Sequence, residues 1–472
     1  MSAPRERLGR GTILALAAMG VAVFVVANDF TALSVAIPAI ESDLDTDLTT
    51  AQWVINAYAL VFGVLIVTGG RLADLLGRRR IFVLGAVVFA VFSVVGGFAP
   101  NAAFLIACRV FMGVGGAMMW PAILGMTFAI LPEDKAGLAG GLILGVAGFG
   151  NAVGPLFGGF LTEVFSWRWV FFVNLPIAVF AIVVTKLEVT ESKGDDPDHR
   201  LDYRGIATLS LGAVAILLAL DEGTDLGWSD PLILGLFALG AIMIGTFAFL
   251  EPRIGSYALV PRDVIANRDF AAACATVLMM SAIFFAALLY LPQFMIKELD
   301  FSALASGAGL LPMMGVFALT SFVAGWLYGK LGPKLIVSVG AAFLCVGMVL
   351  LSFLDADSSY ASLVPGMIVL GMGVGLFYSS ITTAGVTALD PSRSSLAGGI
   401  IYMFQIAGGA IGLGLNTAIV TTGTTLPEGI RAAFRVDAAL ALAGFVIALV
   451  FIGGRVSTDR LRNLRGHHRA HA

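Results

Sequence analysis

Fourteen long apolar runs determine the class of fold that this chain can adopt. Most are close to or above the roughly 20 residues that a helix needs to cross a bilayer. The runs are continuous rather than alternating with polar residues, which favours helices over the strands of a barrel. We expect spans at residues 12–38, 51–70, 81–99, 102–130, 137–162, 169–187, 204–221, 231–250, 270–293, 304–328, 334–354, 361–388, 395–420 and 433–454. The sequence therefore predicts an all-α integral membrane protein.

Composition and charge placement support this prediction and fix an orientation. Only 12% of the residues are charged, against about 25% in soluble globular proteins. With both termini in the cytoplasm, 23 of the 28 Lys and Arg residues lie on the cytoplasmic side. The exceptions are Arg109, which falls within a span, and four residues on the outer side: Arg168, Lys297, Arg431 and Arg435. The positive-inside rule therefore predicts cytoplasmic termini. The first run is longer than a signal-peptide core, so we expect no cleavable signal peptide.

Internal repetition divides the chain. The basic, glycine-rich stretch at residues 70–80 has a weaker copy at residues 325–334, and the sequence Leu-Ala-Gly-Gly at 138–141 returns at 396–399. At the same offset as this second pair, Gly113, Gly115 and Gly154 match Gly371, Gly373 and Gly412. Runs one to six thus pair with runs nine to fourteen as parallel repeats, whereas runs seven and eight have no counterpart.

The repeat predicts four segments. We expect an N-terminal six-helix bundle over residues 1–190 and a linker with two inserted helices over residues 191–260. A C-terminal six-helix bundle should cover residues 261–455, and a basic cytoplasmic tail residues 456–472.

Several motifs in this order resemble one transporter family. They are Asp29-Phe30-Thr31 followed by residues 35–38, Trp53 with Tyr58, Arg109 with Gly113 and Gly115, the glycine-rich residues 148–159, and residues 221–223 with 227–228. Together with the basic loop, the chain resembles the fourteen-helix drug:proton antiporters of the major facilitator superfamily over nearly its whole length. This resemblance implies two six-helix bundles, two inserted helices and transport by alternating access. Ser34 departs from the family's first-helix signature, which usually has Asn and bears on cargo choice.

Asp29 and Arg109 are the acid and the base that we place well inside spans. An ionisable group costs at least about 2.5 kcal/mol there on insertion scales, which makes it a functional candidate. Burial disfavours a carboxylate, whereas a nearby cation stabilises it. We therefore predict that Asp29 carries the coupled proton, and the resemblance implies that Arg109 assists its transfer. The alternatives are a structural ion pair or hydrogen-bonded acid for Asp29 and a side chain reaching the membrane surface for Arg109.

The basic loop is a candidate conformational latch. Gly70 and Gly77 permit close approach and a tight turn, and Asp74 can meet a helix N-terminus or Arg78. The resemblance implies that Asp74 stabilises an outward-facing state. Positive charge that sets the topology is the alternative role for Arg78. Because Gly329 stands where the first copy has Asp74, we expect only the N-terminal loop to form a charged latch.

Small residues recur along the fifth span and permit close helix packing. The resemblance identifies an antiporter motif here, with Gly150, Gly154, Pro155, Gly158 and Gly159. A proline inside a helix removes one backbone donor and favours a kink. The resemblance implies that this segment seals the two bundles together and prevents leakage. The alternative is ordinary helix packing that stays closed throughout the cycle.

Cargo is expected between the two bundles near the midplane. Aromatic faces beside a carboxylate suit a lipophilic cation. The candidate substrate-binding residues are Asp29, Trp53, Asn56, Trp120, Asn151, Tyr290, Tyr378, Tyr402 and Gln405. For any one of the aromatic residues, packing within the bundle or a place in an interfacial belt is an equal alternative.

The favoured function is a proton-coupled antiporter that exports amphipathic, often cationic drugs or dyes across a bacterial cytoplasmic membrane. Its expected partners are the small-molecule cargo, protons and membrane lipids, with no nucleic acid, and we expect a monomer. Export of an endogenous lipid or metabolite is the alternative. A membrane enzyme or sensor would need clustered catalytic residues or a soluble output domain, and the sequence contains neither.

No cofactor is expected beyond the proton gradient as energy source. Cys108, Cys274 and Cys345 lie in spans without a paired-thiol motif, which favours buried apolar roles over a disulfide or a metal site. His199 and the tail histidines are expected in solvated segments rather than in a metal site. With Asp29 as the sole buried acid, we expect one proton to exchange for one monovalent cation, so that no net charge crosses the membrane.

Overall fold

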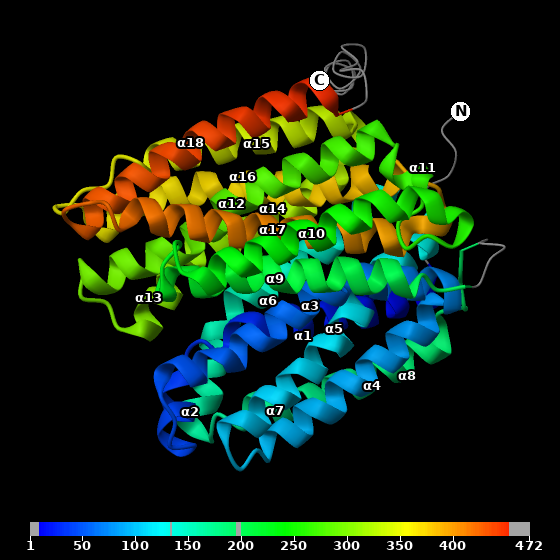
Figure 1. Ribbon diagram of the computed structural model, residues 1–472, viewed down its shortest axis with the longest axis horizontal. Coiled ribbons are helices and arrows are strands. Elements are labelled where there is room, and N and C mark those ends of the chain that lie inside the picture. Colours follow the sequence, from blue (N-terminus) through cyan, green and yellow to red (C-terminus); the bar gives the residue numbers. More distant parts are fainter. Residues whose placement is uncertain (1–8, 133–134, 195–199, 453–472) are drawn as a thin grey trace, which may run out of the picture.

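The computed structural model describes residues 9–132, 135–194 and 200–452 and is built from helices (Figure 1). Within this part of the chain, fourteen helical segments are long and apolar enough to span a membrane, which confirms the predicted number. The predicted tail at 456–472 and all four histidines lie outside the described residues.

Each half of the chain contributes six spans. The first half contains α1 (Arg10–Ala32), α2 (Ile37–Asp43), α3 (Leu48–Leu76), α4 (Arg78–Gly97), α5 (Ala102–Ile130), α6 (Ala136–Val164), α7 (Trp169–Phe172) and α8 (Asn174–Glu188). The inserted pair is α9 (Tyr203–Leu226) and α10 (Pro231–Ile254). The second half contains α11 (Arg262–Ile265), α12 (Arg268–Lys297), α13 (Ala303–Gly309), α14 (Leu311–Leu331), α15 (Pro333–Leu351), α16 (Tyr360–Thr387), α17 (Ser394–Val420) and α18 (Leu426–Phe451).

Prolines explain two boundaries that differ from the predicted spans. The first predicted span, 12–38, is divided: α1 ends at Ala32, and α2 begins at Ile37 with Pro38 in its first turn. The tenth, 304–328, is divided into α13 and α14, and Pro312 lies in the first turn of α14. Proline is favoured in a first helical turn, where its missing N–H leaves no backbone acceptor unpaired. In both cases a new helix thus begins next to the proline.

The two bundles pack according to the repeat. In the first bundle α1 packs on α6, and in the second α12 packs on α17, its counterpart pair. Two seams then join the bundles: α6 against α14, and α3 against α17. These seams are equivalent under the repeat, so the interface has a pseudo-two-fold arrangement.

The inserted helices lie at one seam. Helix α9 contacts both α3 and α17, and α10 packs mainly on α9 (Figure 1). The Nδ2 of Asn56 in α3 donates to Asp221 in α9 at 3.1 Å. Only 11% of the residues in the α10 span are buried, the lowest share among the fourteen described spans. The pair therefore covers the α3–α17 seam from the lipid side.

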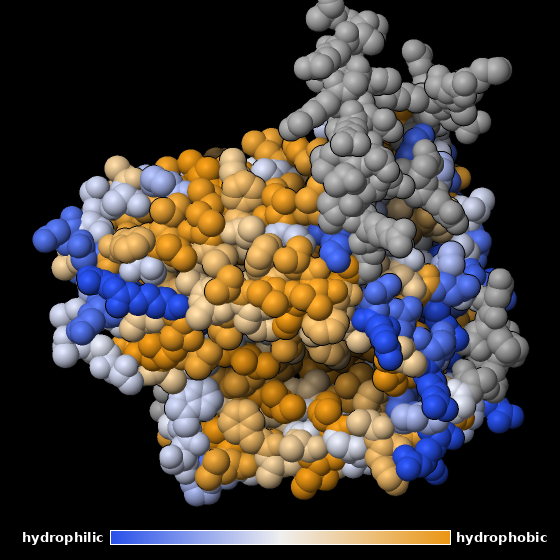
Figure 2. All heavy atoms as spheres, turned by 90° about the horizontal axis from the view of Figure 1, so that it is seen from above, coloured by the Kyte–Doolittle hydropathy of each residue, from blue (hydrophilic) through white to orange (hydrophobic). Residues whose placement is uncertain are grey.

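The surface is divided into an apolar belt and two polar ends, as expected for a chain that spans the bilayer (Figure 2). We call the end where α1 begins and where Arg78, Arg79 and Arg80 begin α4 the basic end. The opposite end carries α2 and α13.

Candidate functional site

Asp29 and Arg109 form an ion pair inside the first bundle. Asp29 lies one turn before the end of α1, and Arg109 lies in the first half of α5. The Nη1 of Arg109 donates to Oδ2 of Asp29, and the two side chains are 0% and 1% exposed. A charge this deeply buried is stable only when it is paired, so each residue depends on the other for its charged form.

Helix α3 holds Arg109 in place from the other side. The Nε of Arg109 donates to the carbonyl of Val54 at 2.6 Å, and the guanidinium carbon lies 4.3 Å from the ring centroid of Tyr58. A cation over an aromatic face is attracted by the ring electrons. Arg109 therefore connects α1, α3 and α5, and a change in the charge of Asp29 acts on all three helices.

A cavity of about 370 Å³ lies between the bundles near this pair. Thr31 and Ser34, just after Asp29 in the chain, line it together with Asn151 and Pro155 of α6. The facing wall comes from α12, α13 and α14 and is mostly apolar, apart from Gln293 and Ser306. A mostly apolar cavity with a few polar groups suits an amphipathic small molecule.

The other predicted cargo residues fall in different places. Trp120 and Tyr402 approach across the interface, with ring centroids 4.5 Å apart, and Trp120 is only 2% exposed. Trp53 and Asn56 instead line a second cavity, of about 160 Å³, with Asp221 of α9. The predicted set is therefore distributed over two cavities and an aromatic contact rather than gathered in one pocket.

The two remaining tyrosines are fixed by hydroxyl hydrogen bonds within the second bundle. Tyr378 shares one with Ser281 at 2.7 Å, and Tyr290 shares one with Thr417 at 2.7 Å. Gln405 lies half-buried on α17. Asp29 itself is sealed behind its ion pair in this conformation.

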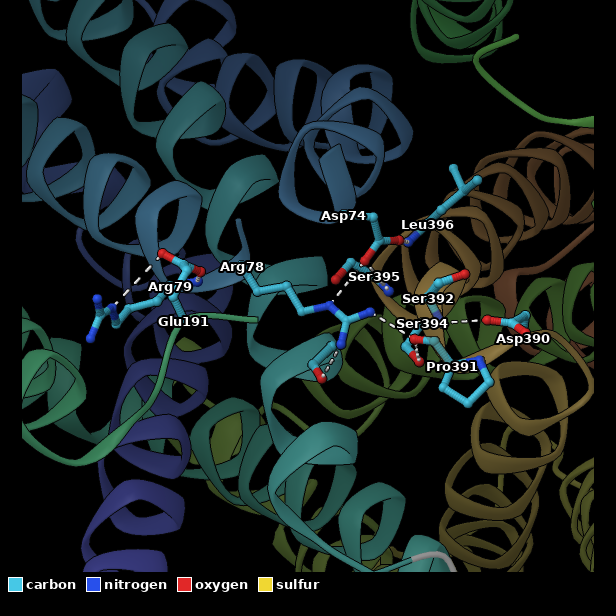
Figure 3. A network of polar contacts seen from close by, with 11 residues as sticks. Asp74, Arg78, Arg79, Glu191, Asp390, Pro391, Ser392, Ser394, Ser395 and Leu396 are labelled. Carbon is cyan, nitrogen blue, oxygen red and sulfur yellow. Dashed lines mark hydrogen bonds and ion pairs between the residues drawn. The ribbon is translucent and has the colours of Figure 1, made fainter. Parts of the chain in front are cut away.

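The basic loop connects the two bundles at the basic end (Figure 3). The carboxylate of Asp74 accepts from the N–H of Leu396 at 2.8 Å and from Nε of Arg78 at 3.0 Å. Arg78 also donates to the carbonyl of Pro391 at 2.7 Å. Asp74 thus meets both the N-terminus of α17 and Arg78, where helix dipole and charge favour a carboxylate.

Glycines allow the backbones of the two bundles to approach closely enough for this contact to form. A Cβ at Gly70 would lie 2.6 Å from the carbonyl oxygen of Ser395, so no larger residue fits without a shift. Gly77 has φ +114°, a conformation that side chains disfavour, and it ends α3 and begins α4. Beside the contact, hydrogen bonds from the side chain and N–H of Ser392 lower the pKa of Asp390 below its usual range. A negative charge therefore precedes α17.

The antiporter motif contacts helices on two sides. A Cβ at Gly150 would lie 3.0 Å from the carbonyl of Phe24, and Cβ atoms at Gly154 and Gly158 would collide with Thr31 and Ala32. These three glycines therefore pack on α1, within their own bundle, because α1 and α6 run side by side there. The resemblance implied that these glycines seal the interface between the bundles, whereas the structure places them against α1 of the first bundle.

The contact between bundles uses other residues of α6. Near the start of the helix, a Cβ at Gly141 would lie 2.9 Å from the carbonyl of Ser321 in α14, and a Cβ at Gly145 2.7 Å from Phe322. At the other end, a Cβ at Gly307 in α13 would lie 3.3 Å from the side chain of Pro155. A Cβ at Gly159 would lie 3.3 Å from Leu304 of α13 and 3.5 Å from Val35 of the first bundle. Of the predicted motif, Pro155 and Gly159 thus face the second bundle.

Comparison with known proteins identifies the family. The model of the Major Facilitator Superfamily matches residues 19–413, and residues 274–469 in a second match. The chain belongs to the major facilitator superfamily. It is therefore a transporter and not an enzyme, and a multi-pass protein of a cell membrane.

This major facilitator protein is similar to several bacterial resistance proteins. It is 33% identical over 461 residues to the puromycin resistance protein of Streptomyces alboniger, covering 96% of this chain and 90% of that protein. It is 31% identical to the multidrug transporter protein MdtP of Bacillus subtilis, covering 85% and 74%. A crystal structure of the human organic anion transporter MFSD10 shares the fold, with a TM-score of 0.66 at 15% identity over 93% of this chain and 99% of that one.

Sequence reasoning missed two buried acids in the spanning helices of this major facilitator protein. Glu251, near the end of α10, and Asp437 in α18 are 1% and 0% exposed, and Asp74 of the latch is also buried, so the expectation that Asp29 is the sole buried acid is wrong. The predicted last span began at residue 433, which placed Asp437 near its edge, whereas α18 begins at Leu426. A capping signal was present, because Thr425 is followed three residues later by Glu428. Among the described residues, no group of three or more His, Cys, Asp or Glu could hold a metal ion.

Proposed function

We propose that this protein is a proton-coupled antiporter that exports amphipathic, often cationic small molecules by alternating access. The observation that carries the proposal is the buried Asp29–Arg109 pair, because an ion pair inside a membrane bundle is costly and marks a proton or ion pathway. The names of the relatives, which include puromycin and multidrug resistance proteins, support drug export.

Proton uptake would act through the ion pair. Protonation of Asp29 removes its negative charge and leaves Arg109 buried without a counter-ion, which is unfavourable. Arg109 must then move toward another partner, and its contacts with Val54 and Tyr58 pass this movement to α3. Because α3 also carries Asp74, the same helix links the proton site to the contact at the basic end.

The conformation fits one stage of the cycle. The Asp74 and Arg78 contacts close the interface at the basic end, whereas the cavity of about 370 Å³ lies toward the opposite end. With the basic end in the cytoplasm, this is an outward-facing arrangement. The latch would break when the transporter opens inward, and α17 would move away from α3.

A cargo panel in proteoliposomes with an imposed pH gradient tests this function. Puromycin, ethidium, tetraphenylphosphonium and a fluorescent lysophospholipid would be compared under the same gradient. We expect transport of cationic amphipaths to follow the gradient and to stop when a protonophore removes it. Gradient-driven movement of the lysophospholipid alone would favour the endogenous-lipid function, and no response to the gradient by any compound would contradict proton coupling.

A further inference from the structure

A further buried acid lies in the other bundle, and no cation contacts it among the described residues. Asp437 stands near the midpoint of the 26-residue helix α18, and its side chain is fully buried. The first turns of α18 carry Glu428 and Arg431, so Asp437 lies inside the span on the side of these residues. A buried carboxylate in a span is costly, which makes Asp437 a functional candidate on the same grounds as Asp29.

Asn416 of α17 contacts this carboxyl group. Its Nδ2 donates to Oδ1 of Asp437 at 3.1 Å and to the carbonyl of Gly412 at 2.9 Å, and Asn416 is also 0% exposed. Among the described residues, Oδ2 of Asp437 and Oδ1 of Asn416 have no hydrogen-bond partner. The pair therefore has two buried acceptors and lacks a donor, which a proton on the carboxyl group would supply.

No described cation compensates Asp437. On its own helix, Arg431 turns to the carbonyl of Leu354 at 2.9 Å, and Arg435 is exposed. The ionisable groups that face it are uncharged at neutral pH: Tyr290 of α12 and Cys345 of α15, whose Sγ contacts the carbonyl of Ala438. The charged residues of α12 and α15, which are Arg268, Asp269, Lys297 and Lys334, lie at helix ends, Glu428 begins α18, and α17 has no charged residue.

Asp29 and Asp437 thus differ in their counter-charge. Asp29 meets Arg109 directly, which favours its ionised form, whereas Asp437 meets only an amide, which leaves the protonated form favoured by burial. The hydroxyl of Tyr290 in α12 bonds Thr417, the residue that follows Asn416 in α17.

We propose that Asp437, held by Asn416, is a second proton-binding site of this transporter. In the loaded form an O–H bond exists on the carboxyl group, and in the unloaded form the proton has left to solvent and the carboxylate keeps the amide hydrogen bond. The proposal rests on the proton coupling proposed above. Two protons would then exchange for one cargo molecule, so export of a monovalent cation moves one net charge.

Infrared difference spectroscopy on the full-length protein in lipid tests proton binding without any cargo. With ¹³C-labelled aspartate, the protonated-carboxyl stretch would be compared between mildly acidic and alkaline pH in wild type, Asp437→Asn and Asp29→Asn. We expect an aspartate band that disappears at alkaline pH in wild type and Asp29→Asn and is missing from Asp437→Asn. A wild type without such a band, or an Asp437→Asn variant that keeps it, would overturn the proposal.

The variant is chosen to preserve the fold. Asn at position 437 has the shape of the neutral acid and retains a hydrogen-bonding group for Asn416. Asp437→Glu gives an independent readout, because it keeps a carboxyl group but moves its band out of the labelled-aspartate signal. If the band stays isotope-sensitive in Asp437→Glu, it comes from another aspartate and the proposal fails.

Coupling is measured in proteoliposomes with tetraphenylphosphonium as the probe. At a fixed pH gradient, valinomycin sets the membrane potential. We expect transport by wild type to depend on the potential, and transport by Asp437→Asn to lose this dependence while still following the pH gradient. If wild type follows the pH gradient but both proteins respond equally to the potential, the second proton-binding site is contradicted, whereas the proposed function is not. If wild type ignores the pH gradient, the proposed function fails, while the infrared result still decides whether Asp437 titrates.

Discussion

At the residue scale, the account depends on the buried pair of Asp29 and Arg109, because each side chain supplies the counter-charge that the other needs inside the bundle. Asp29 and Arg109 stood out because ionisable residues are rare in spans. Their direct contact depends on how α1 and α5 pack, which no local pattern encodes. Asp437 was missed because hydropathy placed the start of the last span too late, and the Thr425–Glu428 cap lies in a polar segment before the apolar run.

Removing Arg109 should leave Asp29 without its counter-charge. Arg109→Gln is expected to lower the free energy of unfolding by about 3–5 kcal/mol, the usual cost of breaking a buried pair, and to abolish pH-driven export. The measurement is thermal unfolding in detergent alongside transport. The double variant Asp29→Asn/Arg109→Gln should regain much of the stability, since no charge stays unpaired, but no transport. An Arg109→Gln protein as stable as wild type would show that the pair is energetically unimportant.

At the element scale, the number and type of helices followed from the apolar runs, but the neighbours of each helix did not. The glycine-rich face of α6 was predicted to pack closely, and it does so on α1 and α14 in different segments. Glycine spacing indicates that a helix approaches closely without indicating which one. The breaks at Pro38 and Pro312 were hidden because the apolar runs continue through them.

Neighbouring glycines of α6 should respond differently to alanine. A Cβ at Gly158 collides with the backbone of Ala32, whereas one at Gly159 meets only side-chain ends, Leu304 at 3.3 Å and Val35 at 3.5 Å. Gly158→Ala should therefore destabilise the protein by about 1–3 kcal/mol, as overpacking does, and Gly159→Ala should change it little. Gly158→Leu should be worse than Gly158→Ala. Equal melting temperatures for the two alanine variants would contradict the close packing of α1 on α6.

Weakening the latch should open the interface at the basic end. Asp74→Asn loses the charge that contacts Arg78 and the N-terminus of α17, and charged hydrogen bonds contribute about 1.5–3 kcal/mol each. We expect the open population to rise by about tenfold or more. Leu124 is 1% exposed on α5, so a Leu124→Cys substitution, in a chain without the three natural cysteines, would report opening through the alkylation rate of its thiol in detergent.

The matched control for the latch is Glu191→Gln. Glu191 accepts from the N–H of Arg79 at 3.0 Å in the same loop and forms ion pairs with Arg79 and Arg80, all in the first half of the chain. Its removal should leave the alkylation rate of the introduced thiol unchanged. Equal rates in Asp74→Asn and Glu191→Gln would indicate that Asp74 stabilises the loop and not the closed interface.

At the scale of the whole molecule, the sequence repeat predicted the pairing of the two halves, and the seams α6–α14 and α3–α17 follow that symmetry. Two features were not predictable. The covering of one seam by α9 and α10 breaks the repeat, so no counterpart helix indicates their place. The closed basic end is one of at least two states that an alternating-access protein adopts, and a single sequence encodes both.

Efflux driven by a pH gradient in proteoliposomes, with the potential clamped by valinomycin, tests the central claim that Asp29 couples proton movement to export. Wild type and Asp29→Asn would be compared with tetraphenylphosphonium as cargo. Because Asn keeps the shape but cannot release a proton, we predict gradient-driven export by wild type and none by the variant. Asn leaves Arg109 unpaired, so the variant should be less stable than wild type, and circular dichroism must show that both proteins are folded at the assay temperature. Uphill export by Asp29→Asn at the wild-type rate would contradict the claim.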